Sequence, residues 1–168
     1  KAMEIFYYEA LCKRLDLLGF KRPKKDRPSP VLLTFNEVNQ IASKTKDIRH
    51  RLMIELAYSA GLRVSELVEI RVKSLDFERL TLLVPGIGRS DRTTLFSKHL
   101  RTNLINQVGT KSGDQYLFPS KRGGKLTTRA VAKFFKKALI ASGLKKMVTP
   151  HSLRQSFTTT MLDKGADP

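Results

Sequence analysis

The sequence is most informative at Thr149-Pro150-His151-Ser152-Leu153-Arg154-Gln155-Ser156-Phe157. Pro150 favours the first turn of a helix, which places His151 and Arg154 near a helix start and three residues apart. Residues at positions i and i+3 project from the same face of a helix. An imidazole and a guanidinium at this spacing can converge on one anionic group, so the segment predicts a phosphate site.

The composition is strongly basic. The 168 residues include 32 lysines and arginines against 15 acidic residues, which gives a formal net charge of +17. An excess of this size favours a polyanionic partner, because basic surface displaces the counterions condensed on nucleic acid. Charge alone leaves two alternatives open, a ribosomal-type protein and a basic surface with no specific partner.

Length and cysteine content narrow the class further. The length fits one domain with an appended helix. Cys12 is the single cysteine, which excludes an internal disulfide framework and a cysteine-based metal site, and favours a reducing cytoplasm. We find no apolar segment as long as a membrane span and no signal peptide, so we predict a cytoplasmic protein without a membrane partner. The sequence starts at Lys1 rather than Met, so we expect a fragment of a longer protein.

Apolar residues recur at helical spacing in several segments. Thr34 and Glu37 have the spacing of a capping box at the start of one such helix. An apolar run, a glycine-rich turn and a second β-branched run instead predict a small antiparallel hairpin. Helices are expected over residues 3–19, from 34, over 48–60, 65–70, 98–108 and 127–142, and from 150 to before 165, with strands at 80–84 and 92–96. The predicted fold class is α+β, mainly α-helical with a small antiparallel β-sheet.

Two basic segments can each be interpreted in two ways, as solvent-exposed or as contacting phosphates. Residues 21–30 contain three prolines, which forbid a continuous helix, so they predict either a solvated tether or a strap lying on phosphates. The helix at 127–142 is basic opposite its apolar stripe, which indicates either a solvated face or a phosphate-facing one. The candidates for contact with a nucleic-acid backbone are Lys21, Arg22, Lys24, Lys25, Arg129 and Lys133.

A second motif lies upstream, in Gly61-Leu62-Arg63-Val64-Ser65-Glu66-Leu67. Alone, Arg63 and Glu66 would be an ion pair on a helix surface, worth roughly a few tenths of a kcal/mol. Followed by a Gly-x-Gly turn at 86–88 and then by Thr-Pro-His-Ser-Leu-Arg, the motif resembles the catalytic domain of tyrosine recombinases, the phage integrase and Xer family. The resemblance implies the DNA breaking-rejoining fold of that family.

The resemblance covers nearly the whole chain. It implies that residues 1–20 are the last helix of a core-binding domain and that 21–30 are a basic interdomain linker. Residues 31–168 would then be a catalytic domain that ends before the nucleophile segment. The implied partners are double-stranded DNA and further copies of the chain, since the family acts as tetramers on two DNA sites.

The resemblance also implies the chemistry, which is site-specific recombination or integration. In this family a tyrosine attacks a scissile DNA phosphate, and a phosphotyrosyl link forms as a 5′-hydroxyl leaves. Arg63 and Arg154 match the residues that clamp the phosphate, His151 matches the one that moves or positions a proton, and Glu66 would orient Arg63. Fixed guanidinium donors suit the equatorial oxygens of the transition state, so we expect no cofactor and no metal ion.

The sequence departs from the family pattern in two places. In the hairpin turn, Ile87 stands where the family has a proton-donating lysine, and Arg89 is a candidate substitute that stabilises charge but donates a proton poorly. The sequence also ends before the family's nucleophilic tyrosine, so we expect this fragment alone to be inactive. The tyrosines present match no nucleophile motif: Tyr7, Tyr8, Tyr58 and Tyr116.

These departures keep two further hypotheses open beside the recombinase. One is a catalytically silent, recombinase-like protein that binds DNA or has a regulatory role. The isoleucine at position 87 and the missing tyrosine favour this hypothesis. The other is a type IB topoisomerase, which shares the chemistry but not the spacing of the motifs. Formation of a covalent protein–DNA adduct separates the recombinase from its silent relative.

Overall fold

The computed structural model describes residues 31–86, 91–163 and 165. Outside the described residues lie the predicted helix at 3–19, the predicted linker at 21–30 with Lys21, Arg22, Lys24 and Lys25, and the hairpin positions Ile87 and Arg89. The prediction of a core-binding helix joined by a linker therefore stays a prediction.

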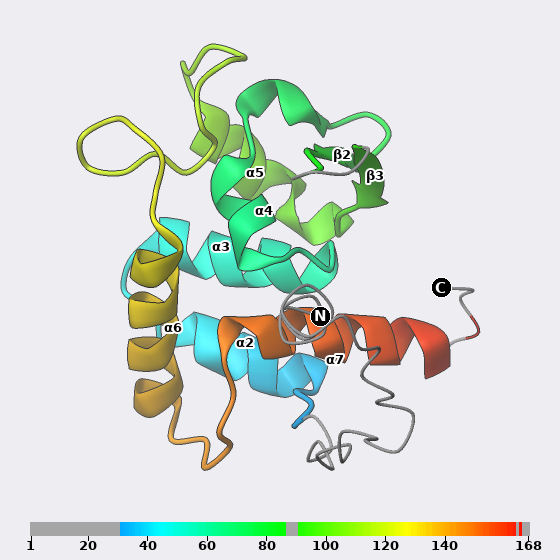
Figure 1. Cartoon of the computed structure of the whole chain (residues 1–168), viewed down its shortest axis with the longest axis vertical. Coiled ribbons are helices and arrows are strands. Elements are labelled where there is room, and N and C mark those ends of the chain that lie inside the picture. Colours follow the sequence, from blue (N-terminus) through cyan, green and yellow to red (C-terminus); the bar gives the residue numbers. More distant parts are fainter. Residues whose placement is uncertain (1–30, 87–90, 164, 166–168) are drawn as a thin grey trace, which may run out of the picture.

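Helices make up most of the described fold (Figure 1). The helices are α2 (Phe35–Ser43), α3 (Ile48–Ser59), α4 (Val64–Glu69), α5 (Arg101–Val108), α6 (Thr128–Ser142) and α7 (Pro150–Asp163), with 3₁₀ turns η1 (Val72–Ser74) and η2 (Lys98–Leu100). The strands β1 (Leu75–Asp76), β2 (Thr81–Val84) and β3 (Arg92–Leu95) form one antiparallel sheet in that order. The predicted class, mainly helical with a small antiparallel sheet, is confirmed.

The sheet has one strand more than the sequence predicted. β2 and β3 form the expected hairpin, with Leu82 opposite Thr94. The additional strand, β1, pairs with β2 on its other side and places Leu75 opposite Leu82. Because β1 is only two residues long, it has no alternation of apolar and polar residues from which it could be predicted.

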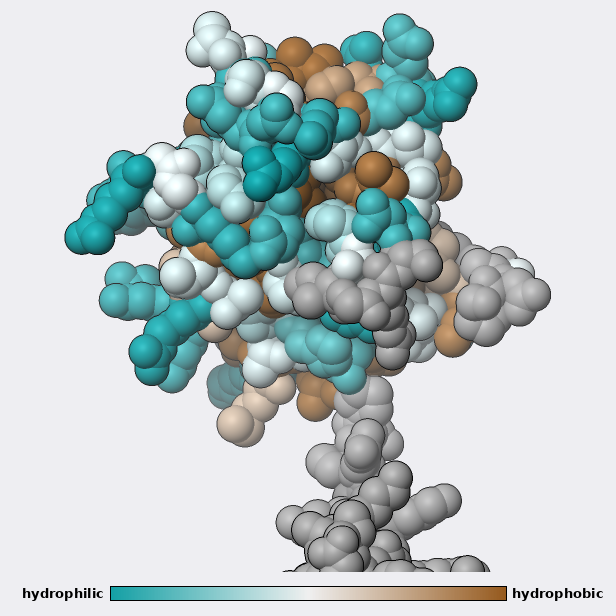
Figure 2. Space-filling model, turned by 45° about the horizontal axis from the view of Figure 1, so that its top comes forward, coloured by the Kyte–Doolittle hydropathy of each residue, from teal (hydrophilic) through white to brown (hydrophobic). Residues whose placement is uncertain are grey.

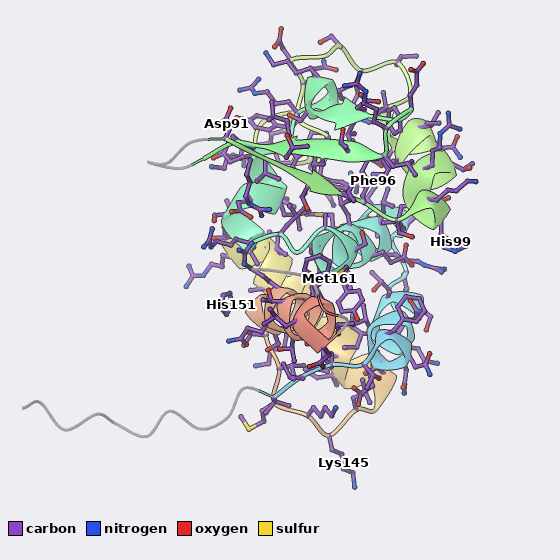
Figure 3. The ribbon with its side chains drawn as sticks, turned by 90° about the vertical axis from the view of Figure 1, so that its right-hand side faces the viewer. Asp91, Phe96, His99, Lys145, His151 and Met161 are labelled. Atoms are coloured by element: carbon purple, nitrogen blue, oxygen red, sulfur yellow. The ribbon has the colours of Figure 1, made fainter. Side chains whose placement is uncertain are left out.

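Helix α3 lies at the centre of the fold. It packs against α2, α6 and α7 as well as against α4 and α5. Figures 1 and 3 both show the sheet, α4 and α5 on one side of α3, and α2 and α7 on the other. Leu52, Met53 and Leu56 of α3 are almost fully buried, so this helix carries much of the core that joins the two sides.

Local signals begin and end the helices as the sequence predicts. The capping box is formed, because Thr34 N donates to Glu37 Oε2 at 2.8 Å and Glu37 N donates to Thr34 Oγ1 at 3.3 Å. Thr127 caps α6 by accepting from Ala130 N at 3.2 Å. At the other end of α6, Gly143 has a φ of 73°, the left-handed conformation that commonly closes a helix.

The face of the molecule visible in Figure 2 is mostly polar. Figure 2 shows hydrophilic side chains over much of the visible face, with smaller hydrophobic patches between them. Within the part of the chain that the structure describes, no helix combines the length and apolar character needed to cross a membrane.

Candidate active site

A tight turn between α3 and α4 positions the first arginine motif. Gly61 has a φ of +58°, and a Cβ at this residue would lie 2.4 Å from Cδ1 of Phe157 in α7. Only glycine fits both the left-handed backbone and this close approach of α7. The turn therefore brings α7, with Arg154, against the start of α4, which Arg63 precedes as its cap residue.

Glu66 holds Arg63 at two points. Arg63 N donates to Glu66 Oε2 at 2.8 Å, and Arg63 Nη1 donates to Glu66 Oε1 at 2.9 Å. The Glu66 side chain is only 7% exposed, whereas that of Arg63 is 49% exposed. The pair is therefore not the surface ion pair that spacing alone would give: the carboxylate is buried and the guanidinium is open to a ligand.

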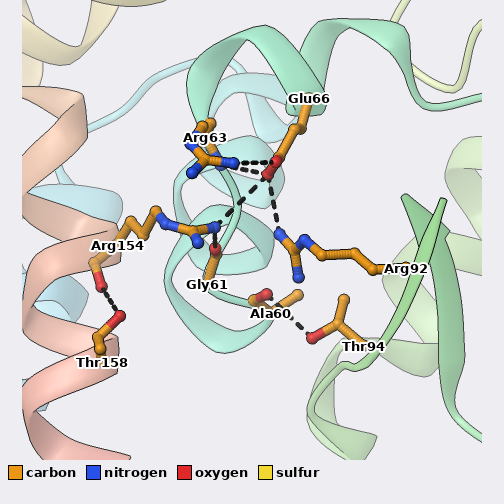
Figure 4. Close-up of polar contacts among 8 residues, drawn as sticks. All are labelled: Ala60, Gly61, Arg63, Glu66, Arg92, Thr94, Arg154 and Thr158. Atoms are coloured by element: carbon orange, nitrogen blue, oxygen red, sulfur yellow. Dashed lines mark hydrogen bonds and ion pairs between the residues drawn. The ribbon is translucent and has the colours of Figure 1, made fainter. Parts of the chain in front are cut away.

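Helix α7 brings the second arginine motif to the same carboxylate. Arg154 Nη1 lies 3.6 Å from Glu66 Oε2 and donates to the carbonyl oxygen of Gly61 at 2.5 Å (Figure 4). Helix α7 is held in place by buried Ser156, whose Oγ accepts from Leu33 N at 2.8 Å. Residues far apart in the sequence therefore converge on one site.

A third arginine, which sequence reasoning missed, comes from the hairpin. Arg92 Nη2 in β3 donates to Glu66 Oε2 at 2.9 Å (Figure 4). Its Nε is buried and has no hydrogen-bond partner among the described residues. No signal in the sequence indicated it, because an alternating strand would bury Leu95, whereas the structure half-buries Arg92 and Thr94 and leaves Leu95 exposed. Thr94 Oγ1 in turn donates to the carbonyl oxygen of Ala60 at 3.1 Å, so the two inward side chains of β3 reach α4 and the α3–α4 turn.

We call Glu66 with Arg63, Arg92 and Arg154 the arginine cluster. Three guanidiniums against one carboxylate leave an excess of two positive charges. Burial raises the pKa of Glu66, but hydrogen bonds from the Arg63 backbone and the Arg92 guanidinium outweigh it and hold this pKa below its usual range. Burial, followed by the charges of Arg63 and Arg92, lowers the pKa of Arg154, yet arginine still stays protonated at neutral pH. The cluster is therefore cationic and suits a phosphate.

The remaining predicted residues lie around the cluster or away from it. His151 is exposed in the first turn of α7, and Figure 3 shows it toward the same edge of the molecule as Asp91, where the second arm of the hairpin starts. Arg129 and Lys133 are exposed on α6. Lys133 also lines a groove of about 760 Å³ whose other basic side chains are Lys44, Lys46, Lys121, Lys137 and His50.

The domain is helical with a small antiparallel sheet, and arginines from separate elements surround one buried carboxylate. This is the architecture of a DNA breaking-rejoining catalytic domain. The chain belongs to the phage integrase family, whose model matches residues 32–168.

Individual relatives show how far the similarity extends. Tyrosine recombinase XerA of Pyrococcus horikoshii is 38% identical over 167 residues, which cover 96% of this chain and 57% of the relative. A putative integrase/recombinase of Sinorhizobium fredii, y4qK, is 36% identical over 147 residues, which cover 86% of this chain and 48% of the relative. The chain thus spans about half the length of the curated relatives it matches.

Solved structures show the same fold. The crystal structure of XerA recombinase superposes with a TM-score of 0.74 at 25% identity, covering 97% of this chain and 60% of the other. The Tn1549 transposon integrase, solved with circular intermediate DNA, superposes with a TM-score of 0.78 at 21% identity, covering 99% of this chain and 66% of the other.

Proposed function

We propose that the full-length protein is a tyrosine-type site-specific DNA recombinase or integrase. The observation that carries the proposal is the convergence of Arg63 and Arg154, from two distant motifs, on buried Glu66 in a cluster with excess positive charge. The guanidiniums of such a site present paired N–H donors, which suit an anion with several oxygens. A DNA phosphate is an anion of this kind. The named relatives are recombinases and integrases, which supports an enzyme over the silent DNA-binding alternative.

In the proposed reaction, Arg63 and Arg154 donate hydrogen bonds to the non-bridging oxygens of the scissile phosphate. A tyrosine oxygen attacks phosphorus while the bond to the 5′ oxygen breaks, so a phosphotyrosyl ester forms and a 5′-hydroxyl leaves. His151 takes up or positions the proton of the tyrosine. Negative charge grows on the equatorial oxygens in the transition state, where fixed guanidiniums stabilise it most. Attack by the hydroxyl of a partner strand then reverses the chemistry and rejoins the DNA.

The leaving 5′ oxygen needs a proton, and the hairpin position that carries a lysine in the family holds Ile87. An isoleucine has no proton to give. We propose that Arg89 stabilises charge at this oxygen without acting as an efficient acid, because a guanidinium holds its protons tightly. The expected consequence is slower cleavage than a lysine at position 87 would allow.

The partners and the compartment belong to the same proposal. The ligand is double-stranded DNA, with backbone contacts from Lys21, Arg22, Lys24, Lys25, Arg129 and Lys133. Recombination of two sites calls for a homo-oligomer, which we propose to be a tetramer on two duplexes. We propose that the protein acts in the cytoplasm, where the lone Cys12 stays reduced.

A nicked suicide substrate tests the proposal. The substrate contains the DNA site that is recovered by selecting the genomic fragments that the protein binds. We expect the full-length protein to form a covalent adduct with it that survives denaturing gels. The Arg154→Ala variant should form this adduct about 100- to 1,000-fold more slowly, by analogy with removal of one oxyanion donor. Tight binding of the site without an adduct would contradict the enzyme and favour the silent relative. Relaxation of supercoils by a monomer would favour the topoisomerase.

A further inference from the structure

Glu66 is the point at which three structural elements meet. Arg63 precedes α4, Arg154 lies in α7 and Arg92 lies in β3, and each guanidinium approaches the same carboxylate. The contacts are unequal, since Arg63 Nη1 and Arg92 Nη2 lie at 2.9 Å from the carboxylate while Arg154 Nη1 lies at 3.6 Å. Two arginines therefore hold Glu66 closely, whereas Arg154 is bonded to the carbonyl oxygen of Gly61 and only approaches the carboxylate.

The strand that carries Arg92 is itself fixed. Arg92 pairs with Val84 of β2, which is 1% exposed, and Thr94 two residues along is bonded to the α3–α4 turn. The backbone from which the Arg92 side chain extends is therefore held in place beside the α3–α4 turn, and its Nη2 donates to Glu66 Oε2 at 2.9 Å. Arg92 is thus a firm contact between the hairpin and Glu66.

Removal of Arg92 would change what Glu66 Oε2 contacts. This oxygen accepts from Arg63 N at 2.8 Å and from Arg92 Nη2 at 2.9 Å. Without Arg92, the remaining guanidinium beside this buried oxygen among the described residues, apart from that of Arg63, is Arg154, whose Nη1 lies 3.6 Å away. A buried carboxylate that has lost a partner draws strongly on a neighbouring guanidinium, because an unpaired buried charge is costly. Arg154 would then close onto Glu66 and offer fewer donors to a phosphate.

We propose that Arg92 is a positioning residue of the phosphate site, which holds Glu66 Oε2 so that the carboxylate fixes Arg63 and leaves Arg154 free for the ligand. The inference rests on the proposed function, because it assigns Arg154 to a DNA phosphate. It adds a residue that belongs to neither arginine motif, and it gives the hairpin a role in the clamp that does not depend on the residue at position 87.

The first test compares cleavage and DNA binding in the full-length protein. Arg92→Gln removes the positive charge, and Arg92→Lys keeps the charge but lacks the paired N–H donors of a guanidinium. Arg51→Gln is the matched control. Arg51 Nε contacts Glu55 Oε1 at 2.8 Å within α3, so the control also removes one arginine–glutamate contact and one positive charge. We expect Arg92→Gln to slow cleavage of saturating DNA about 10- to 100-fold, with Kd within about twofold of that of Arg51→Gln. Arg92→Lys should recover part of the loss.

A second test asks whether Arg92 acts through Glu66. If it does, the double variant Arg92→Gln/Glu66→Gln should cleave about as slowly as the slower single variant, whereas multiplied losses would overturn the inference. A methylphosphonate at the scissile position removes one charged oxygen, so we expect the loss to shrink in Arg92→Gln and in Arg154→Ala alike. A merely structural defect would leave the fold-loss unchanged on both substrates and would also overturn the inference.

Crystal structures of the wild type and of Arg92→Gln supply a readout that needs no cleavage. The separation of Arg154 from Glu66, 3.6 Å in the wild type, should shorten to about 2.8 Å in the variant. An unchanged separation would refute the positioning role even if cleavage occurs. If the wild type forms no adduct but the separation shortens, the proposed function fails while the arrangement of the cluster stands.

Discussion

Replacement of Gly61 by alanine tests how the α3–α4 turn builds the site. A φ of +58° costs an L-residue about 1–2 kcal/mol. The new Cβ would also lie 2.4 Å from Cδ1 and 2.6 Å from Cε1 of Phe157, so the ring or the helix that carries it must shift. Overpacking of this kind costs about 1–3 kcal/mol. We therefore expect Gly61→Ala to lower the free energy of unfolding by roughly 2–5 kcal/mol.

Urea denaturation followed by circular dichroism measures the change, with Gly143→Ala as the matched control. Gly143 also has a left-handed φ of 73°, but no atom of the described residues lies within 4 Å of a Cβ built there. Its replacement should cost only the backbone part, about 1–2 kcal/mol. In a Phe157→Leu background the cost of Gly61→Ala should fall toward the same value, because the ring that causes the overlap is gone.

The outcome also bears on the site, because the carbonyl of Gly61 accepts from Arg154 Nη1. A turn displaced by the new methyl group should slow cleavage by more than the loss of folded protein explains. A cost below about 1 kcal/mol for Gly61→Ala, or an equal cost in both backgrounds, would refute the steric argument.

Further predictions concern stability and DNA binding. Ser156→Ala leaves the buried Leu33 N–H without its partner and should cost about 1–3 kcal/mol in urea denaturation. Hydrogen bonds from Arg49 lower the pKa of Asp47 to about 2, so this carboxylate stabilises the fold above its usual pKa and the contribution is lost as the pH falls toward 2. Asp47→Asn should therefore cost about 1 kcal/mol at pH 7, after allowance for solvent screening, and almost nothing at pH 2. Lys133→Glu should weaken DNA binding for all sequences and reduce the slope of log Kd against log salt by about 1.

Local signals were sufficient for the helices between residues 31 and 163, because each depends on residues close in sequence. The Thr34 capping box and the glycine at 143 act within one turn, so their geometry follows from their spacing. The hairpin was predictable for the same reason. The strand β1 was not, since its two residues are extended only because β2 offers them a partner.

The site was only partly accessible to sequence reasoning. Spacing places His151 and Arg154 on one helix, but the approach of Arg154 to Arg63 depends on the packing of α7 against the α3–α4 turn, and only the family resemblance indicated it. Arg92 lies outside both arginine motifs, and alternation along its strand would turn Leu95 inward instead. The structure has the opposite orientation, with Leu95 exposed and Arg92 half-buried, because Glu66 offers the arginine a buried partner.

The buried carboxylate explains how three guanidiniums share one site. Packed together, they would repel, and burial of an unpaired charge costs on the order of several kcal/mol. Glu66 offsets that cost, yet its oxygens are occupied mainly by Arg63 and Arg92. An arginine has five N–H donors, and Arg154 uses one of its nitrogens on the carbonyl of Gly61. Arg63 and Arg92 likewise each use one guanidinium nitrogen, on Glu66, but the Arg63 side chain is 49% exposed against 37% for Arg92 and 26% for Arg154. A phosphate entering the cluster should therefore meet Arg63 first and be completed by the remaining donors of Arg154.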